Sequence, residues 1–478
     1  MTLTRRFILC ILLISMALSM AACGYGTTGE PDTPPDSAVS EDVYVPTPDV
    51  PAGYTGTTDG YIYRYADGRD REWEEDILFL AQYALENHPY LTEMCETMDI
   101  YRRWGKSDEF YDPELRELFI QNVDALIGEV PQLDDMGVLY GMQKVLNTLH
   151  DMHSIVWLFY GDRFPIAFEG FYEEDGLKLY TVMVPADRED AIFCQLYSVN
   201  GYTVDEVFEL LTPYTSQETQ EAVESMIINN FLPYLDPLRA AGIIEKDADA
   251  VEYVLLNEDG EKVSLKLTAD SYENVQTADV LDMRPTAQGW YAYARDNEVT
   301  YWFDYILEEN TVYVRVNAFL EMEDMPYGDF YDWVLDICRR AYKPAKLIVD
   351  LRDNGGGYQY YELVNYASSI SFINDLTTYI LIDTDSASAA VLEPVVMCDC
   401  NENAYIVGTP AMQSPIIATN RESLKFPNHE DHWFRISTRI NVYDNFADET
   451  LMPDIEIYPT FDDYKNGVDT ILEAVKAF

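Results

Sequence analysis

The apolar positions of the chain change their spacing along its length, and three regions can be distinguished. In the first region, apolar side chains recur every three or four positions in the stretches 73–85, 115–127 and 136–149. This spacing places them on one face of a helix. Pro89 and Pro131 interrupt the pattern and separate the stretches. The sequence therefore predicts a helical N-terminal region over residues 71–160.

Residues 165–275 form the second region, with short runs that alternate apolar and polar side chains, as strands do. Asn200-Gly201 and the segment 257–260 place turn-forming residues between the runs. Helical spacing returns over residues 219–233. The sequence predicts a small α+β domain here.

Residues 295–478 alternate strand-like and helix-like patterns. Strands are predicted at 312–316, 347–349 and 377–382, and helices at 330–342 and 363–370. Such alternation is typical of βαβ units, whose parallel strands share one sheet. The predicted fold class is α/β.

The first 22 residues have the pattern of a secretory signal. Arg5 and Arg6 precede an apolar run, residues 7–20, that is short for a membrane span. The run leads into Ala-Ala-Cys23, which resembles a bacterial lipobox and implies lipidation of Cys23. The alternative is an ordinary signal peptide followed by an unrelated cysteine. With lipidation, we expect the mature chain to be anchored on the extracytoplasmic face of the cell membrane.

Composition narrows the possible partners. Residues 23–70 are rich in Gly, Thr, Pro, Asp and Ser, so we expect a disordered tether. The formal net charge is −54, from 85 acidic and 31 basic residues, which argues against nucleic acid or anionic lipid as a partner. The cysteines after Cys23 are odd in number and sparse, so no disulfide framework is predicted. Cys398-Asp-Cys400 has no second pair of ligands for a metal.

A glycine-rich turn follows the predicted strand at 347–349. It reads Asp350-Leu-Arg352-Asp-Asn354-Gly-Gly356-Gly357. Glycines adopt backbone angles closed to other residues, and they can point several N–H groups at one oxyanion. The alternative is a tight turn closed by an Asp350–Arg352 salt bridge. The nucleotide-binding glycine patterns do not fit, because no Lys-Ser/Thr follows and position 360 is not glycine.

Residues 350–357 resemble the Asp-Leu-Arg-x-Asn-x-Gly-Gly signature of the tail-specific (C-terminal processing) serine peptidases, which include the tricorn core. The resemblance implies a crotonase/ClpP-like βα superhelix as the peptidase core over 295–478. It also implies a PDZ-like domain over 165–275, where residues 195–204 are similar to a short PDZ segment. An unrelated α+β insertion is the alternative for that domain. The resemblance gives Asp350, Arg352 and Asn354 structural roles at the site.

Two histidines three positions apart follow the helical region. His150 and His153 could bind a metal from one helix face, but no third ligand is evident near them in the sequence, so no metal is predicted. A structural role at a helix end is a second alternative. Leu149-x-Asp151-x-His153 resembles the family's Leu-x-Asp-x-His-Thr segment. The resemblance implies that His153 is the general base, as in the tricorn-like branch.

Ser386 and Ser388 lie between a predicted strand and a helix. A serine at a helix N-terminus is most often an N-cap, but the helix dipole there also favours a negative oxygen. The resemblance implies that Ser388 is the nucleophile, with the N–H groups of Gly356 and Ala389 as oxyanion hole. Ser388 fits better than Ser386, because the segment 406–408 then falls where the family places its next strand and glycine.

The sequence departs from the family pattern at three places. Val391 replaces a glutamate, residues 409–414 contain no lysine, and Met452 replaces the glutamate of Glu-Pro-Asp. The third catalytic residue is therefore open, with Asp151 and Asp454 as candidates. His429-Glu-Asp-His432 is one residue short of the zinc-protease pattern His-Glu-x-x-His, so we expect a surface loop there.

The sequence thus predicts a membrane-anchored serine endopeptidase. It would cleave unfolded or C-terminally exposed polypeptides through a Ser/His acyl-enzyme, without a cofactor. One alternative is a catalytically silent peptidase-fold lipoprotein that binds peptides, favoured by the three departures. Another is an adhesin or solute-binding lipoprotein, which leaves the order of glycines, serine and histidine unexplained.

Overall fold

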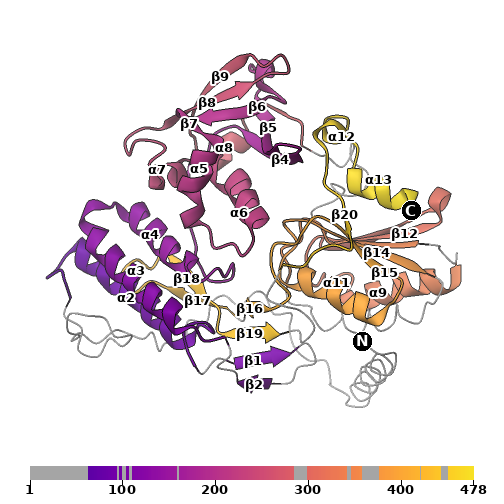
Figure 1. Ribbon diagram of the computed structural model, residues 1–478, viewed down its shortest axis with the longest axis horizontal. Coiled ribbons are helices and arrows are strands. Elements are labelled where there is room, and N and C mark those ends of the chain that lie inside the picture. Colours follow the sequence, from indigo (N-terminus) through magenta and orange to yellow (C-terminus); the bar gives the residue numbers. More distant parts are fainter. Residues whose placement is uncertain are drawn as a thin grey trace.

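The computed structural model describes residues 63–93, 96–99, 104–106, 110–158, 161–284, 299–341, 346–357, 376–419, 421–442 and 450–478. The predicted signal, nearly all of the tether, Cys23 and the helix at 363–370 lie outside the described residues. Figure 1 shows three units: a helical unit, an α+β unit and a sheet covered by helices on both faces.

The helical unit contains α2 (Arg69–Asn87), α3 (Pro113–Glu129) and α4 (Asp135–Asn147), as the apolar spacing predicted. Asp112 and Asp134 cap the N-termini of α3 and α4 with their carboxylates. The helices share one apolar core, and Phe426 and Phe434 from the far end of the chain belong to it. Phe434 lies on β18 (Trp433–Ile436), which pairs with β17 (Glu422–Lys425) and β3 (Ile155–Val156).

A second small sheet corrects the expectation of an all-helical first region. β1 (Glu96–Asp99) pairs with β2 (Trp104–Lys106), and it also pairs in parallel with β19 (Arg439–Val442), which continues to β16 (Ile417–Thr419). β1 and β2 are only four and three residues long, and the parallel partner of β1, β19, is more than 300 residues away, so the apolar spacing of 71–160 did not indicate these strands.

The α+β unit contains an antiparallel sheet in the order β10-β5-β6-β8-β9, with β4 paired to β5 and β7 to β6. Its strands are β4 (Ala167–Glu173), β5 (Gly176–Pro185), β6 (Gln195–Val199), β7 (Tyr202–Thr203), β8 (Ala250–Leu256), β9 (Lys262–Thr268) and β10 (Val280–Asp282). The predicted hairpin is confirmed as β8–β9. The helices are α5 (Val204–Leu211), α6 (Gln220–Met226), α7 (Leu235–Ala240) and α8 (Tyr272–Gln276).

The α/β unit is built on a six-stranded sheet in the order β11-β12-β13-β14-β15-β20. The strands are β11 (Tyr301–Ile306), β12 (Thr311–Val316), β13 (Lys346–Asp350), β14 (Thr377–Ile382), β15 (Ala404–Gly408) and β20 (Ile455–Glu456). All neighbours from β12 to β20 are parallel, and β11 is antiparallel to β12. The predicted α/β class is therefore confirmed.

Helices cover both faces of this sheet. α9 (Tyr327–Asp336) and α11 (Ala389–Cys400) pack on one face, and α13 (Thr470–Ala477) packs on the other (Figure 1). Every residue of β12 is buried, as expected for a strand covered on both faces. The carboxyl ends of β13 and β14 meet at one edge of the sheet, where the predicted site residues follow.

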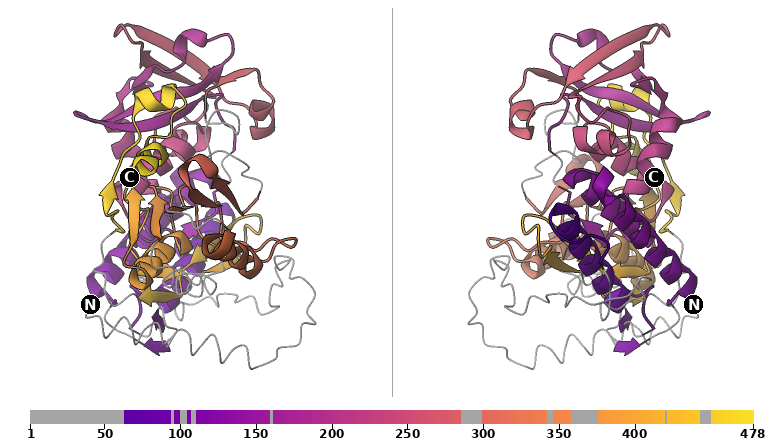
Figure 2. Two further views of the ribbon diagram at one scale, coloured as in Figure 1. Left: turned by 90° about the vertical axis from the view of Figure 1, so that its right-hand side faces the viewer. Right: turned by 90° about the vertical axis from the view of Figure 1, so that its left-hand side faces the viewer.

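Aromatic side chains join the α+β unit to the α/β unit. Phe461 of α12 (Phe461–Lys465) stacks on Tyr180 of β5, with ring centroids 3.8 Å apart. Figure 2 shows α12 beside the strands of the α+β unit in both side views. The α+β unit is thereby fixed above the sheet edge. None of the helices in the described ranges is long and apolar enough to cross a membrane.

Candidate active site

Ser388 stands between β14 and α11 in a strained conformation. Its backbone angles are φ 55° and ψ −115°, a region that residues with a side chain rarely adopt. Ser388 occupies the N-cap position of α11, but its side chain forms no capping hydrogen bond, so its hydroxyl does not have the usual role of an N-cap serine. The residue is half-buried and thus partly open to solvent. The hydroxyl of Ser388 therefore lies at the start of α11 without a hydrogen bond to the N–H groups of this helix.

Ser386, two residues earlier, is bound on both sides. It is fully buried, its Oγ donates to the carbonyl of Leu351 at 2.8 Å, and it accepts the N–H of Asp383 at 3.0 Å. These bonds join the ends of β13 and β14. The hydroxyl of Ser386 therefore has a structural role, which supports the choice of Ser388 as the reactive serine.

Gly356 lies directly against Ser388. Its φ is +92°, and a Cβ on this residue would lie 2.6 Å from the Cβ of Ser388 and 3.0 Å from the N of Ala389. No side chain fits into that space. The glycine turn and the serine turn are therefore in contact, as the family resemblance implied for an oxyanion site.

Of the two predicted oxyanion donors, one is engaged elsewhere. The N–H of Gly356 donates to Oδ1 of Asn354 at 2.8 Å, so Gly356 does not offer it to an oxyanion in this structure. The reason is an Asx-type turn, in which an asparagine side chain accepts the N–H two residues on. Ala389 is the first residue of α11, and helices leave such N–H groups without an intrahelical acceptor.

Asn354 connects three segments around the serine. Its Nδ2 donates to the carbonyl of Val316 at the end of β12, at 2.7 Å. Its own carbonyl accepts the N–H of Ala387 at 2.9 Å. Together with its bond to Gly356, these contacts hold the glycine turn, β12 and the serine turn in one arrangement.

Asp350 and Arg352 lie in a buried charge network. Arg352 binds Asp350 through Nε and Nη2 at 2.9 and 2.6 Å, and Asp469 at the start of α13 through Nη1 and Nη2, both at 2.8 Å. Arg315 and the hydroxyl of Tyr313 also donate to Asp350. Burial alone would raise the pKa of Asp350, but Arg352 and Arg315 outweigh it and lower the pKa to about 2. This network fixes the glycine turn to the rest of the sheet.

His153 lies in the turn after α4, and Asp151 organises that turn. Oδ1 of Asp151 accepts the N–H of His153 at 2.9 Å, while Oδ2 accepts from Ser154 Oγ at 2.5 Å and from His88 Nε2 at 3.1 Å. Burial would raise the pKa of Asp151, but His153 and His88 outweigh it and hold the pKa well below its usual range. Asp151 is thus an ionised anchor for the histidine segment.

The imidazole of His153 is only 2% exposed. Its Nδ1 is 3.7 Å from Oδ1 of Asp151 and has no hydrogen-bond partner within the described structure. A carboxylate of the α+β unit, Glu218, completes a group with Asp151 and His153, one ligand atom of each lying within 4.8 Å of the others. The sequence had indicated no third ligand near His153; folding brings Glu218 to the turn that already contains Asp151 and His153.

Gln413 connects this group to the serine. Its Oε1 accepts the N–H of Ser388 at 2.6 Å, and its Nε2 donates to Oε1 of Glu218 at 3.2 Å. The sequence pattern indicated neither Glu218 nor Gln413. Glu218 lies in a loop without a motif. Gln413 stands in the segment 409–414, where the one signal was the missing lysine of the family pattern.

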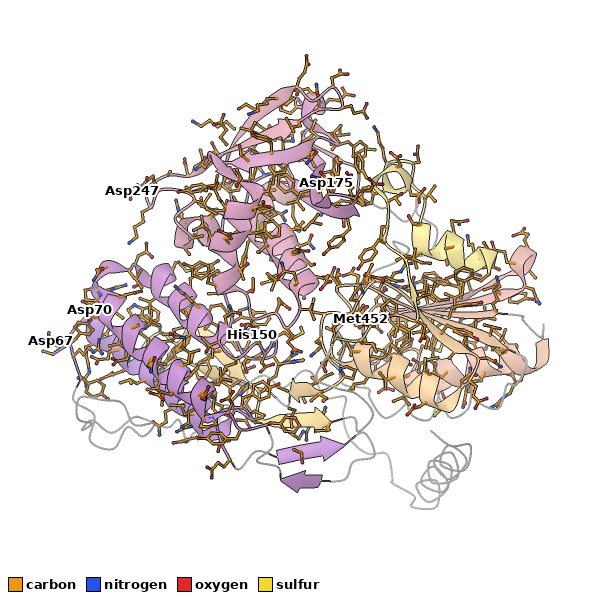
Figure 3. All side chains as sticks on the ribbon, viewed as in Figure 1. Asp67, Asp70, His150, Asp175, Asp247 and Met452 are labelled. Carbon is orange, nitrogen blue, oxygen red and sulfur yellow. The ribbon has the colours of Figure 1, made fainter. Side chains whose placement is uncertain are left out.

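The other candidate for the third residue, Asp454, is engaged with the sheet. Its Oδ2 accepts the N–H of Ile406 on β15 at 2.9 Å. Met452 is 51% exposed, and Figure 3 shows it on the side of the α/β unit that faces the segment of His150. Val391 is fully buried in the apolar core, where a glutamate would be a buried charge. Of the predicted orienting residues, Asp151 is therefore the one beside His153.

Comparison with known proteins finds similarity at the level of structure. No family model and no curated protein matches the sequence. Among solved structures, a serine-to-alanine mutant of CPAF aligns with a TM-score of 0.59 and 13% identity, over 85% of this chain and 96% of that chain. CPAF complexed with lactacystin aligns with a TM-score of 0.57 and 12% identity, over 85% and 98%.

The fold is that of CPAF. The alignment covers nearly all of the CPAF chain, so all three units belong to the shared fold. A photosystem II D1 C-terminal processing protease also aligns over 85% of this chain, with a TM-score of 0.37. A TM-score this low does not establish a common fold.

Several carboxyl groups gather beside the serine turn. The N–H of Asp353 donates to Asp383 at 2.9 Å, and Ser225 Oγ donates to Asp385 at 2.6 Å. Burial, followed by the charge of Asp385, raises the pKa of Asp383 to about 7, and burial raises the pKa of Asp385 to about 6. Burial and the neighbouring aspartates raise the pKa of Glu169 on β4 to about 8. The charge of this edge therefore changes around neutral pH.

The structure also shows how the 429–432 segment and the cysteines are placed. His429 stacks on Trp73 with ring centroids 3.5 Å apart, and its Nδ1 lies 2.7 Å from Asp76. The segment 429–432 is a loop at the surface, as expected, and His429 attaches it to α2. The described cysteines Cys194, Cys338, Cys398 and Cys400 are all free, which agrees with the absence of a predicted disulfide framework among them.

Proposed function

We propose that this chain is a serine endopeptidase in which Ser388 is the nucleophile and His153 the general base. The observation that carries the proposal is the conformation of Ser388. Its backbone is strained, its hydroxyl serves neither the helix nor the sheet, and Gly356 is fitted against it. Strain of this kind collects at functional sites, where the surrounding structure holds it. A turn with no functional role would not be expected to keep such backbone strain.

The proposed reaction is acyl transfer. His153 accepts the proton of Ser388, whose Oγ attacks a peptide carbonyl; the amine leaves with the proton, and water then hydrolyses the acyl-enzyme. Gln413 binds the backbone of Ser388 and the carboxylate of Glu218, and Glu218 lies beside His153. Catalytic hydrogen bonds often tighten only when substrate binds.

The oxyanion would be stabilised at the start of α11. The N–H of Ala389 and the dipole of this helix favour a negative oxygen there. Gly356 becomes a second donor only if its N–H leaves Asn354. We propose that substrate binding produces this change in the glycine turn.

The α+β unit would receive the polypeptide substrate. We propose that it is a PDZ-like domain and that the sheet unit is a βα superhelix of the crotonase/ClpP type. The contribution of Glu218 from this unit supports the idea, because substrate bound there would act directly on the histidine group. The substrate would be an unfolded or C-terminally exposed polypeptide.

The test is covalent labelling together with turnover. A fluorophosphonate probe should label the wild type and not Ser388→Ala, and only the wild type should hydrolyse a pool of unstructured peptides. Ser386→Ala is the matched control: it should lose thermal stability, because its hydroxyl bridges two strand ends, but keep the label. If folded wild-type protein, treated with a chelator to remove any bound metal, shows neither label nor turnover, the alternative of a silent peptide-binding lipoprotein replaces this proposal.

Export and anchoring are a separate part of the proposal. The charged start, the apolar run and Ala-Ala-Cys23 support lipidation of Cys23 and location on the outer face of the cell membrane. Metabolic labelling with a fatty-acid analogue should mark the wild type and not Cys23→Ala. Equal labelling of both would refute the anchor without affecting the peptidase proposal.

A further inference from the structure

The group formed by Asp151, His153 and Glu218 has the composition of a metal site. One ligand atom of each residue lies within 4.8 Å of the others; Asp151 and His153 share the turn after α4, and Glu218 comes from the α+β unit. Zinc bonds of about 2.0–2.2 Å place ligand atoms roughly 3–3.6 Å apart. The 3.7 Å between His153 Nδ1 and Asp151 Oδ1 needs only a small contraction to fit.

The second observation is the imidazole itself. Nδ1 of His153 belongs to a side chain that is 2% exposed, and it has no hydrogen-bond partner within the described structure. Buried polar atoms are normally paired, so an orphaned ring nitrogen beside two carboxylates requires an explanation. A neutral imidazole nitrogen is also the commonest protein ligand for transition metals.

The surrounding hydrogen bonds would hold the ligands in position. Asp151 is fixed by His88 and Ser154, and Glu218 accepts from Gln413. Outer contacts of this kind orient metal ligands and tune their affinity. The two carboxylates also balance the charge of a divalent ion.

The ligand set selects the type of metal. Calcium and magnesium prefer sites built from oxygen ligands alone, whereas an imidazole with carboxylates suits zinc and its first-row neighbours. Three protein ligands leave a fourth position open, as in zinc sites that exchange a ligand.

We propose that Asp151, His153 and Glu218 bind Zn²⁺ and that bound Zn²⁺ switches the site off. The first part of the proposal, that the three residues bind Zn²⁺, is inferred from their geometry alone. The inhibitory half rests on the proposed function, because a histidine that ligates zinc cannot accept the proton of Ser388. The metal and the base role of His153 therefore exclude each other.

Binding is tested with Co²⁺ on the purified full chain, since tetrahedral Co²⁺ gives visible absorption bands that Zn²⁺ removes by displacement. One equivalent should bind to the wild type, and Glu218→Gln should weaken binding at least tenfold. Glu209→Gln, an exposed carboxylate on α5, is the matched control and should bind as the wild type does. Equal binding by wild type and Glu218→Gln, or no stoichiometric binding, would overturn the site.

A second measurement does not depend on the variants folding. Zinc X-ray absorption of the wild type should report one imidazole and otherwise oxygen ligands. Two imidazoles would point to another site, such as His429 and His432, and sulfur ligands would point to the cysteines; either result overturns the assignment.

The inhibitory half is tested by activity. Zn²⁺ should stop peptide hydrolysis at the concentration at which it displaces Co²⁺, and a chelator should restore it. Full hydrolysis with Zn²⁺ bound would overturn the switch. An inactive metal-free protein that still binds one Co²⁺ would refute the peptidase proposal while supporting the metal site, so the two failures are distinguishable.

Discussion

The edge of the α/β sheet and the histidine segment are linked through Gln413 and Glu218, but they are built in different ways. The sheet edge comes from contiguous residues: the motif 350–357 supplies its own aspartate, arginine, asparagine and glycines, and these bind one another. The histidine group is assembled from distant parts, because Glu218 comes from the α+β unit and Gln413 from the α/β unit. The first can be read from local sequence. The second exists only when the units are docked.

The largest expected effect is on the rate of peptide hydrolysis, and it tests the histidine segment. His153→Ala should lower kcat for peptide hydrolysis by on the order of 10³-fold or more, because it removes the proposed base. Its melting temperature should also fall, because truncating a buried imidazole leaves a cavity and removes a neighbour of the buried Asp151 carboxylate, so the rate is compared well below the melting transition. Rate and thermal melting of the same preparation check this. A variant that retains most of its activity would show that another group is the base.

The next effect concerns the sheet edge. Arg352→Ala should destabilise the fold by about 3–5 kcal/mol, because it removes the arginine that pairs with buried Asp469 and one of the two arginines that pair with buried Asp350. Urea unfolding measures it. Arg188→Ala is the control: its exposed pair with Asp190 should contribute about 0–1 kcal/mol. Equal small losses in both variants would contradict the structural role of Arg352.

A smaller effect depends on pH. Glu393 on α11 is fully buried, its Oε1 accepts from the hydroxyl of Tyr331, its Oε2 has no partner in the described structure, and burial raises its pKa to about 8. A carboxyl with a raised folded-state pKa contributes stability below its unfolded pKa and loses it as pH rises towards 8. The free energy of unfolding should fall between pH 5 and 8.5.

Glu393→Gln should flatten part of this slope, by roughly 1–3 kcal/mol across the range, because an amide cannot ionise. Glu209→Gln, an exposed substitution, should leave the slope as it is. Denaturant unfolding at a series of pH values measures all three proteins. A Glu393→Gln slope identical to that of the wild type would mean that this carboxyl ionises normally.

The smallest effect tests the contact between the glycine and serine turns. Gly356→Ala should cost about 1–3 kcal/mol, because φ is +92° and the new Cβ would meet Ser388, and it should also reduce fluorophosphonate labelling. Gly328→Ala is the matched change. Gly328 lies in α9, and no atom lies within 4 Å of the place that a Cβ would take, so this change should stabilise by about 0.5–1 kcal/mol. Labelling unaffected by Gly356→Ala would separate the two turns functionally.

Local pattern predicted much of the fold. The helices α2, α3 and α4, the β8–β9 hairpin and the parallel strands β13 and β14 follow from apolar spacing and turn residues. The strands β1 and β2 were missed because they are only four and three residues long and β1 also relies on a parallel partner far along the chain. The surface loop at 429–432 was expected, but its contacts with Trp73 and Asp76 on α2 were not, because those residues are far away in the chain.

The sequence by itself determined the glycine turn, the serine at a helix start and the histidine after α4, because each depends on residues that are neighbours in the chain. The tertiary structure decided which serine hydroxyl is engaged, since Ser386 Oγ donates to the carbonyl of Leu351, just after the end of β13. It also decided that Asn354 takes the N–H of Gly356 and that Glu218 stands beside His153. Hydrogen bonds and burial between distant segments depend on how the units pack, and no local spacing encodes that packing.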